Sequence, residues 1–239
     1  MLQLQQIKLC HCSCKQSHSC SPAHHFLLGR KMVNLQPYLP HMSANTILGL
    51  KLPTDPRWVD IAGIALEDIL TDHAFCEQKA ATTMISIIQR YSDRAELVDK
   101  LSPVVTEEWG HFRMVLAELK KRGMHLGKQR KDDYVNALLA HDPKTGSQEE
   151  KLLNKLCICA LIEARSCERF RLLSLHINDD KLKEFYHKFM VSEAGHYRLF
   201  LDLARYYFPE EQVKERWQWW LQTEKQIMAD MPPRADRIH

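Results

Sequence analysis

The sequence predicts an all-α protein: a four-helix bundle of two helical hairpins, joined by a long connection and followed by an extra C-terminal helix. Three observations lead to this fold class. From residue 54 onwards, apolar residues recur at three- and four-residue spacing, the period of a helix with one buried face. The 239 residues include only 8 Gly and 10 Pro, too few for the frequent turns of an all-β chain. No strand pattern of appreciable length appears in the sequence.

The first hairpin is expected in the N-terminal half of the bundle. An Asp-Pro pair at 55–56 opens a helix whose apolar stripe continues to Tyr91. Asp93 and Glu96 have the spacing of a capping box, which predicts the start of the second helix. Gly123 is expected to end that helix.

The second hairpin follows a polar connection with a short helical piece near 134–140. Ser147 and Glu150 form another capping box, which opens the third long helix. The turn at 178–180 leads into the fourth, and Pro209 ends it. A last amphipathic helix then runs to about residue 228, and burial is the expected role of its tryptophans, with base stacking as the alternative.

Composition narrows the class of protein further. A hydrophobic fraction of 45% and a charged fraction of 26% are ordinary for a soluble globular chain. No run approaches the ~20 apolar residues of a membrane span, so an integral membrane protein is not expected. The net charge of +3 permits an anionic partner without requiring one. The cysteines lack the spacing of a secreted disulfide framework, which favours the cytoplasm.

Three regions are expected along the chain. Residues 46–230 form the helical bundle, and residues 231–239 form a flexible tail. Residues 1–45 are expected to be a disordered extension, because they show no apolar periodicity. A structural zinc site there is the less favoured alternative, since the spacing of the possible ligands does not match a zinc finger. Those ligands are Cys10, His11, Cys12, Cys14, His18, Cys20, His24 and His25.

Each of the four long apolar stripes contains a glutamate where an apolar residue is expected. A buried, unpaired carboxylate costs several kcal/mol, so each needs a counter-charge. Two of the stripes add a histidine three residues after the glutamate, a spacing that lets both side chains reach one metal ion. The residues concerned are Glu77, Glu108 with His111, Glu163, and Glu193 with His196.

Hairpin geometry predicts that the first two of these glutamates meet. Ser92, at the expected turn, lies 15 residues after Glu77 and 16 before Glu108. An antiparallel hairpin therefore brings the two carboxylates to the same height.

The second hairpin makes the same prediction. Its turn at Asp179 lies 16 residues after Glu163 and 14 before Glu193. Glu168 is the reserve ligand, but it lies off the apolar stripe and roughly 4–5 Å from the matching height at 1.5 Å per residue.

A glutamate from each of two helices, with Glu-x-x-His from each of the other two, is the pattern of di-iron and di-manganese bundles. Four carboxylates and two neutral imidazoles balance two divalent ions. Ligand type does not separate iron from manganese. His73, one turn before Glu77, is expected to hydrogen-bond a ligand rather than bind metal. The competing interpretation is buried salt bridges or solvated faces, which the absence of Lys and Arg from these stripes disfavours.

At these residues the sequence resembles the bacterial di-iron tRNA hydroxylases of the MiaE type, which are ferritin-like. The resemblance spans roughly residues 52–208 and leaves residues 1–45 without an inherited role. The most specific stretch is Glu-Ala-Arg-Ser-Cys-Glu-Arg-Phe at 163–170. The other matching segments are 72–81, 107–111 and 192–196.

The resemblance implies an O2-dependent monooxygenase with two iron ions and an external electron donor. It implies hydroxylation of the isopentenyl group of 2-methylthio-N6-isopentenyl-adenosine, beside the anticodon in a tRNA loop. By the family's pattern the iron ligands are Glu77, Glu108, His111, Glu163, Glu193 and His196. The alternative is a ferritin-like di-iron oxidase, peroxidase or iron-storage protein that does not act on RNA.

Basic residues between the second and third long helices are the candidate tRNA contacts, since phosphates attract Lys and Arg. The alternative is that they complement the helix dipole. They are Lys120, Lys121, Arg122, Lys128, Arg130 and Lys131.

Overall fold

A computed structural model describes residues 25–28, 31–34, 47–232 and 234–238. The chain divides into two units, Met1–Leu39 and Pro40–His239. In the first unit, strands β1 (His25–Leu28) and β2 (Lys31–Asn34) pair antiparallel, with His25 opposite Asn34. This short ladder was not predicted, because four-residue strands leave too little alternation to detect in a sequence. The other Cys and His residues considered for the less favoured zinc site lie outside the described residues, as does most of the expected disordered extension.

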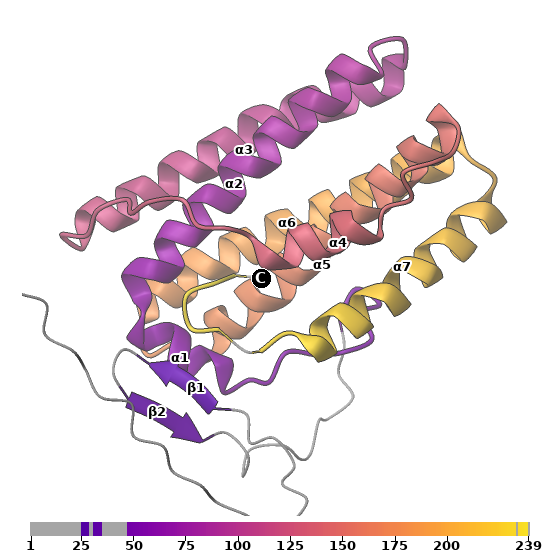
Figure 1. Cartoon of the computed structure of the whole chain (residues 1–239). Helices are drawn as coiled ribbons and strands as arrows, with labels where there is room; N and C mark the ends of the chain where they lie inside the picture. Colours follow the sequence, from indigo (N-terminus) through magenta and orange to yellow (C-terminus); the bar gives the residue numbers. More distant parts are fainter. Residues whose placement is uncertain (1–24, 29–30, 35–46, 233, 239) are drawn as a thin grey trace, which may run out of the picture. The chain divides into compact units, whose positions relative to one another are not determined.

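The second unit is the predicted bundle of two hairpins (Figure 1). Helix α2 (Leu66–Arg90) packs along α3 (Ala95–Lys121), and α5 (Gln148–His176) packs along α6 (Asp180–Tyr207). Within the described residues, all secondary structure outside the β1–β2 hairpin is helical, which confirms the all-α fold class.

Several helix ends follow the sequence signals. Ser147 and Glu150 form the full capping box of α5, and the Asp179 side chain accepts the Leu182 N–H at the start of α6. Gly123 ends α3 with a φ of 69°, a backbone conformation that glycine adopts without strain.

Two details of the first hairpin differ from the prediction: one helix is not continuous, and another begins later than expected. The helix expected from residue 55 to Tyr91 is broken at Ala65, so that a short α1 (Trp58–Ile64) precedes α2. The capping box expected at Asp93 and Glu96 does not form, because α3 begins one residue later and its N-cap makes no side-chain hydrogen bond.

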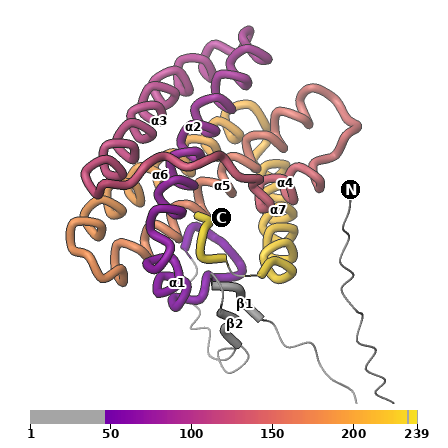
Figure 2. Tube along the Cα trace, turned by 60° about the vertical axis from the view of Figure 1, so that its left-hand side comes forward, coloured from indigo at the N-terminus to yellow at the C-terminus, as the bar shows by residue number. Residues whose placement is uncertain are grey.

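The connection between the hairpins crosses α2 on its way to α4 (Asp133–His141), as Figures 1 and 2 both show. Polar contacts with α2 hold it there. The Gly127 N–H donates to Thr71 Oγ1 at 3.2 Å, and Arg130 pairs with Asp68 at 2.9 Å. The expected C-terminal helix is α7 (Glu210–Asp230), which packs against α5.

The expectation of a flexible tail over 231–239 is wrong for its last described residues. Ile238 is fully buried, and its N–H donates to Asp72 Oδ2 at 2.8 Å. Arg237 lies 3.5 Å from the same carboxylate. Arg237 and Ile238 are held in place because both contact Asp72 of α2, a tertiary effect that local sequence does not reveal.

The core has two parts, and the glutamates of the apolar stripes lie between them along the bundle. One part surrounds Leu156 and Phe200, and the other surrounds Phe170 and Phe189. Among the described helices, none is long and apolar enough to cross a membrane.

Candidate metal centre

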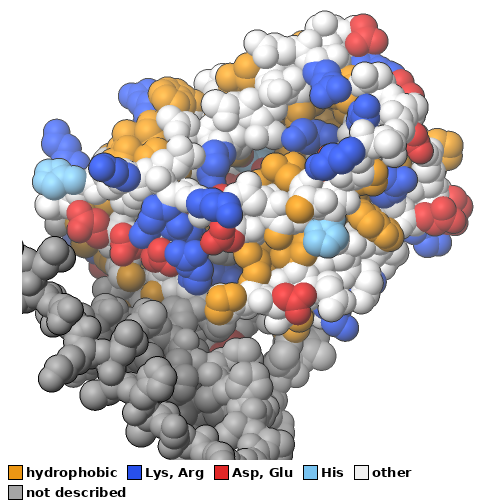
Figure 3. Space-filling view, viewed as in Figure 1, with side chains coloured by type: hydrophobic (Ala, Val, Ile, Leu, Met, Phe, Trp, Pro, Cys, Tyr) orange, Lys and Arg blue, Asp and Glu red, His pale blue; other side chains and the backbone are white. Residues whose placement is uncertain are grey.

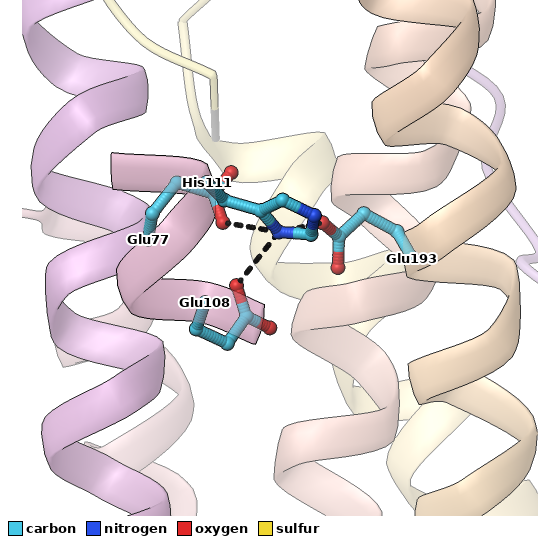
Figure 4. A group of neighbouring side chains, drawn as sticks. All are labelled: Glu77, Glu108, His111 and Glu193. Carbon is cyan, nitrogen blue, oxygen red and sulfur yellow. Dashed lines mark hydrogen bonds and ion pairs between the residues drawn. The ribbon is translucent and has the colours of Figure 1, made fainter. Parts of the chain in front are cut away.

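Six acidic and imidazole side chains from four helices converge at mid-bundle, and we call them the carboxylate–histidine cluster. Two groups of four can be distinguished, in each of which ligand atoms lie within 4.8 Å of one another. Glu108 and Glu193 belong to both groups. Figure 4 shows the first group, whose side chains point toward one another from α2, α3 and α6. The groups are Glu77, Glu108, His111 and Glu193, and Glu108, Glu163, Glu193 and His196.

Both histidines direct Nδ1 into this cluster. His196 Nδ1 lies 2.9 Å from Glu108 and 3.1 Å from Glu193. His111 Nδ1 lies 3.3 Å from Glu108 and 3.5 Å from Glu77. Glu108, which is fully buried, therefore lies between the two imidazoles.

The structure distinguishes Glu163 from its reserve, Glu168. Glu163 lies in the cluster with Glu193 and His196. Glu168 instead accepts hydrogen bonds from the Thr54 N–H at 2.9 Å and hydroxyl at 2.8 Å, and it pairs with Arg165.

Crowding of buried carboxylates changes their proton affinity. Burial and the neighbouring charges of Glu108 and Glu193 raise the pKa of Glu77 well above its usual range. Burial and the charges of Glu193 and Glu108 do the same to the pKa of Glu163. For Glu108, burial acts in the same direction, but hydrogen bonds with the two histidines outweigh it and lower the pKa.

The pKa values of both imidazoles are raised as well. Burial disfavours a charged His196, but hydrogen bonds to Glu108 and Glu193 outweigh it and raise the pKa to about 12. The pKa of His111 is also raised, since the Glu108 and Glu193 carboxylates outweigh its burial. The raised pKa values of Glu77, Glu163 and both histidines favour their protonated forms, which reduces the negative charge of the metal-free cluster.

The donor set fits two divalent metal ions. None of the four carboxylates forms an ion pair with Lys or Arg in the described part of the chain. Glu193 Oε1 is buried and accepts no hydrogen bond there. Four carboxylates and two neutral imidazoles offer a charge of −4, which two divalent ions balance without the protons.

His73 lies beside the cluster in an aromatic enclosure. Its Nε2 is 2.7 Å from Glu77 Oε1, and its side chain is fully buried. Its ring centroid lies 4.4 Å from that of Phe189 and 4.5 Å from that of Phe170. These rings hold the imidazole against Glu77.

A cavity of about 180 Å³ reaches the cluster from the side of α2 and α5. Glu77, Glu163 and Glu193 form its polar end. Near its mouth, Lys79 of α2 pairs with Asp132, whose other oxygen caps α4 by accepting the Val135 N–H. Its apolar wall includes Ala80, Met84, Cys159, Ile162 and Phe200.

The candidate tRNA contacts divide into two kinds. Arg122 pairs with Glu118 and Asp179, and Arg130 pairs with Asp68 and Asp236, so both hold parts of the fold together. The lysines are exposed at the surface, where Lys121 also pairs with Glu118 and Lys131 with Asp133 (Lys120, Lys121, Lys128 and Lys131). On the face of the connection, Lys and Arg gather with carboxylates among them (Figure 3).

Sequence reasoning left Glu107 without a role, although it precedes Glu108 directly. Its carboxylate lies 3.3 Å from His196 Nε2 and accepts the Ser192 hydroxyl at 2.6 Å. Partial burial opposes ionisation, but the Ser192 hydrogen bond and the His196 charge outweigh it and lower the pKa of Glu107. Its place in the sequence, between a polar residue and a ligand, resembles that of an ordinary solvated glutamate. The last helix buries Trp217 and Trp220, as expected, whereas Trp219 is exposed.

A four-helix bundle in which two glutamates and two Glu-x-x-His motifs share one buried cluster belongs to the ferritin-like class of dinuclear metal proteins. The family model described as tRNA-(MS[2]IO[6]A)-hydroxylase (MiaE) matches residues 41–239. The chain therefore belongs to the MiaE family.

Individual relatives agree with this assignment. A Pseudomonas putida protein named tRNA 2-(methylsulfanyl)-N(6)-isopentenyladenosine(37) hydroxylase is 38% identical over 168 residues, covering 69% of this chain and 78% of its own. A Salmonella typhimurium protein of the same name is 26% identical, covering 84% and 90%. A solved Synechococcus structure, described as a protein with aldehyde deformylating oxygenase activity, has a TM-score of 0.75 and 34% identity. It covers 81% of this chain and 96% of its own.

Proposed function

We propose that this chain is a di-iron monooxygenase that hydroxylates the isopentenyl group of 2-(methylsulfanyl)-N6-isopentenyladenosine in tRNA. Membership of the MiaE family and the names of both curated relatives support this substrate. The observation that carries the chemistry is the buried carboxylate–histidine cluster, which fits two divalent ions. The same family membership favours tRNA hydroxylation over the alternatives of iron storage and oxidase or peroxidase activity without RNA.

The six residues of the cluster would hold two iron ions, with Glu108 and Glu193 shared because they belong to both groups of ligands. Iron in such a site would supply the activation of O2 for hydroxylation of an allylic carbon of the isopentenyl group. The chain contributes a fixed set of donors, an almost fully buried environment and a hydrogen bond from His73 to Glu77.

The cavity between α2 and α5 suits the isopentenyl group. Its apolar wall matches a branched hydrocarbon, and its inner end contains three of the carboxylates. A short apolar group that enters it approaches the metal ligands while the rest of the nucleoside stays near the mouth. The Lys79–Asp132 pair lies at that mouth, where the polar part of the substrate would lie.

The partners follow from the reaction. Hydroxylation with O2 requires two electrons from an external donor protein, in addition to tRNA as the substrate. The modified adenosine lies in the anticodon loop, where a base can leave the stack at a cost of a few kcal/mol. The exposed lysines of the connection are the proposed phosphate contacts, and the cytoplasm is the proposed location.

The proposal is tested by nucleoside analysis of tRNA treated with iron-loaded protein, a chemical reductant and ¹⁸O2. We expect one ¹⁸O atom in the isopentenyl group, and an unchanged nucleoside would contradict the substrate. Ala80→Phe fills the cavity and should slow turnover by about 100-fold with iron content unchanged. Ile85→Phe, at an exposed position of the same helix, is the matched control. An aldehyde substrate tests the activity described for the Synechococcus protein.

A further inference from the structure

Glu107 occupies the outer side of the carboxylate–histidine cluster, between its two imidazoles. Its Oε2 lies 3.3 Å from His196 Nε2, and its Oε1 lies 3.8 Å from His111 Nε2. Both are ion-pair contacts: the second distance exceeds a hydrogen bond, and His196 Nε2 makes no hydrogen bond within the described residues. One carboxylate thus faces the outer nitrogens of both histidines.

The orientation of the two imidazole rings indicates what Glu107 does at this position. Both histidines present Nδ1 to the buried carboxylates, at 2.9–3.5 Å from the nearest oxygens. A neutral imidazole that binds a metal through Nδ1 carries its proton on Nε2. That N–H needs an acceptor, and the acceptor fixes both the tautomer and the orientation of the ring. Each oxygen of Glu107 faces one such nitrogen.

Glu107 is itself held in place from the facing helix. The Ser192 hydroxyl of α6 donates to Glu107 Oε1 at 2.6 Å. Glu107 and Ser192 occupy the same position in the two Glu-x-x-His motifs, each directly before the ligand glutamate. The Glu107 side chain is 49% exposed, so water solvates its charge and its ionised form carries no large burial cost.

We propose that Glu107 is the positioning residue of the metal centre, orienting both histidines with Nδ1 toward the ions. This inference rests on the proposed metal site. It assigns one shared carboxylate to two ligands on different helices. A purely structural link between α3 and α6 would affect folding and would leave the metal site of the folded protein unchanged.

Cobalt(II) is a suitable probe, because its visible absorption reports ligand geometry without turnover. We expect Glu107→Ala to bind cobalt 10- to 100-fold more weakly than the unaltered chain and to change the spectrum. Glu107→Gln keeps the size of the side chain and one acceptor oxygen, so an intermediate affinity is expected. Glu184→Ala, at an exposed position of α6, is the control and should bind as the unaltered chain does.

Unaltered cobalt affinity and spectrum in Glu107→Ala would overturn the proposal, and so would an equal loss in Glu184→Ala. If Glu107→Ala does not fold, Glu107→Gln decides by the same criterion, and its thermal unfolding without metal should match that of the unaltered chain. If the unaltered chain itself binds no cobalt, the proposed metal site is wrong. If it binds two ions and Glu107→Ala matches it, only the role of Glu107 is wrong.

Discussion

Helix α5 carries two buried glutamates, five residues apart, whose charges are balanced in different ways. Glu163 lies in the carboxylate–histidine cluster, where Lys and Arg form no ion pair with the carboxylates in the described residues. Glu168 lies in what we call the arginine cluster, formed by Arg165, Arg169, Glu168 and Glu224 with Thr54. The fully buried Arg165 donates to Glu224 Oε1 at 3.0 Å and to the Leu52 carbonyl at 3.0 Å.

This difference distinguishes a candidate metal site from a cluster that links parts of the fold. The arginine cluster contains its own cations, Arg165 and Arg169, and its hydrogen bonds join α5 to α7 and to the segment before α1. The carboxylate–histidine cluster reaches neutrality only with protons or added cations. A buried group of anions without a matching side-chain cation is therefore the feature that indicates metal binding.

The largest expected effect is the loss of function on removing a shared ligand. Glu108→Ala should abolish iron loading and turnover, because both proposed ions lose a donor. The helical content should stay the same, since the variant removes one of several crowded anions. Metal analysis and circular dichroism measure the two effects. Full iron content with normal turnover would show that the assigned ligands are wrong.

Removing Arg165 from the arginine cluster should instead lower the stability of the fold and leave iron binding unchanged. Arg165→Met removes the cation that pairs with the buried Glu168 and Glu224, which should cost about 3–5 kcal/mol of unfolding free energy. Iron binding per folded chain should stay at the level of the unaltered protein. Urea unfolding measures the first quantity. The double variant Arg165→Met with Glu224→Gln should recover part of the loss, and no recovery would contradict the charge argument.

The pH dependence of stability should differ between the metal-free and the metal-loaded protein. The raised pKa values of Glu77, Glu163 and His196 mean that the folded metal-free chain keeps protons that the unfolded chain releases. Its stability is therefore lost as pH rises above the ordinary Glu value of 4.5 and, for His196, from 6.5 towards about 12. Each retained proton contributes roughly 1.4 kcal/mol per pH unit.

Denaturant unfolding of the metal-free chain between pH 6 and pH 9 should show this decline, and saturating metal should remove most of it. The lowered pKa of Glu108 has the opposite sign, but its effect lies below pH 4.5. A metal-free protein that gains stability over this range would contradict the assigned protonation.

The smallest effect concerns the basic residues of the connection. Lys128→Glu with Lys131→Glu should weaken tRNA binding and lower the slope of log affinity against log salt by about 2. Arg130→Ala should mainly destabilise the fold, because Arg130 pairs with Asp68 and Asp236. Lys214→Glu, exposed on α7, is the control for binding measured at several salt concentrations. An unchanged slope in the double variant would place the tRNA contacts elsewhere.

Local sequence signals predicted the helices and the height at which their glutamates meet. The apolar period, the Ser147 capping box and Gly123 are local features, and the distances from Ser92 and Asp179 set the register of each hairpin. Long-range contacts were not accessible in this way. The buried Ile238 depends on Asp72, 166 residues away, and the role of Arg130 depends on the position of α2.

The same limit applied within the site. Glu163 was distinguishable from Glu168 by its place on the apolar stripe, since that stripe faces the bundle interior. Glu107 was not distinguishable from a solvated surface residue, because its proposed role depends on contacts with Ser192 and His196 on a different helix.

The central claim is that two cations replace the protons of the carboxylate–histidine cluster. Anaerobic titration of the metal-free protein with ferrous iron tests it, with the released protons counted at neutral pH. We predict two ions per chain and a release of protons on binding, from His196 and from the groups whose pKa values are also raised, Glu77, Glu163 and His111. Uptake of iron without proton release, or no uptake, would contradict it.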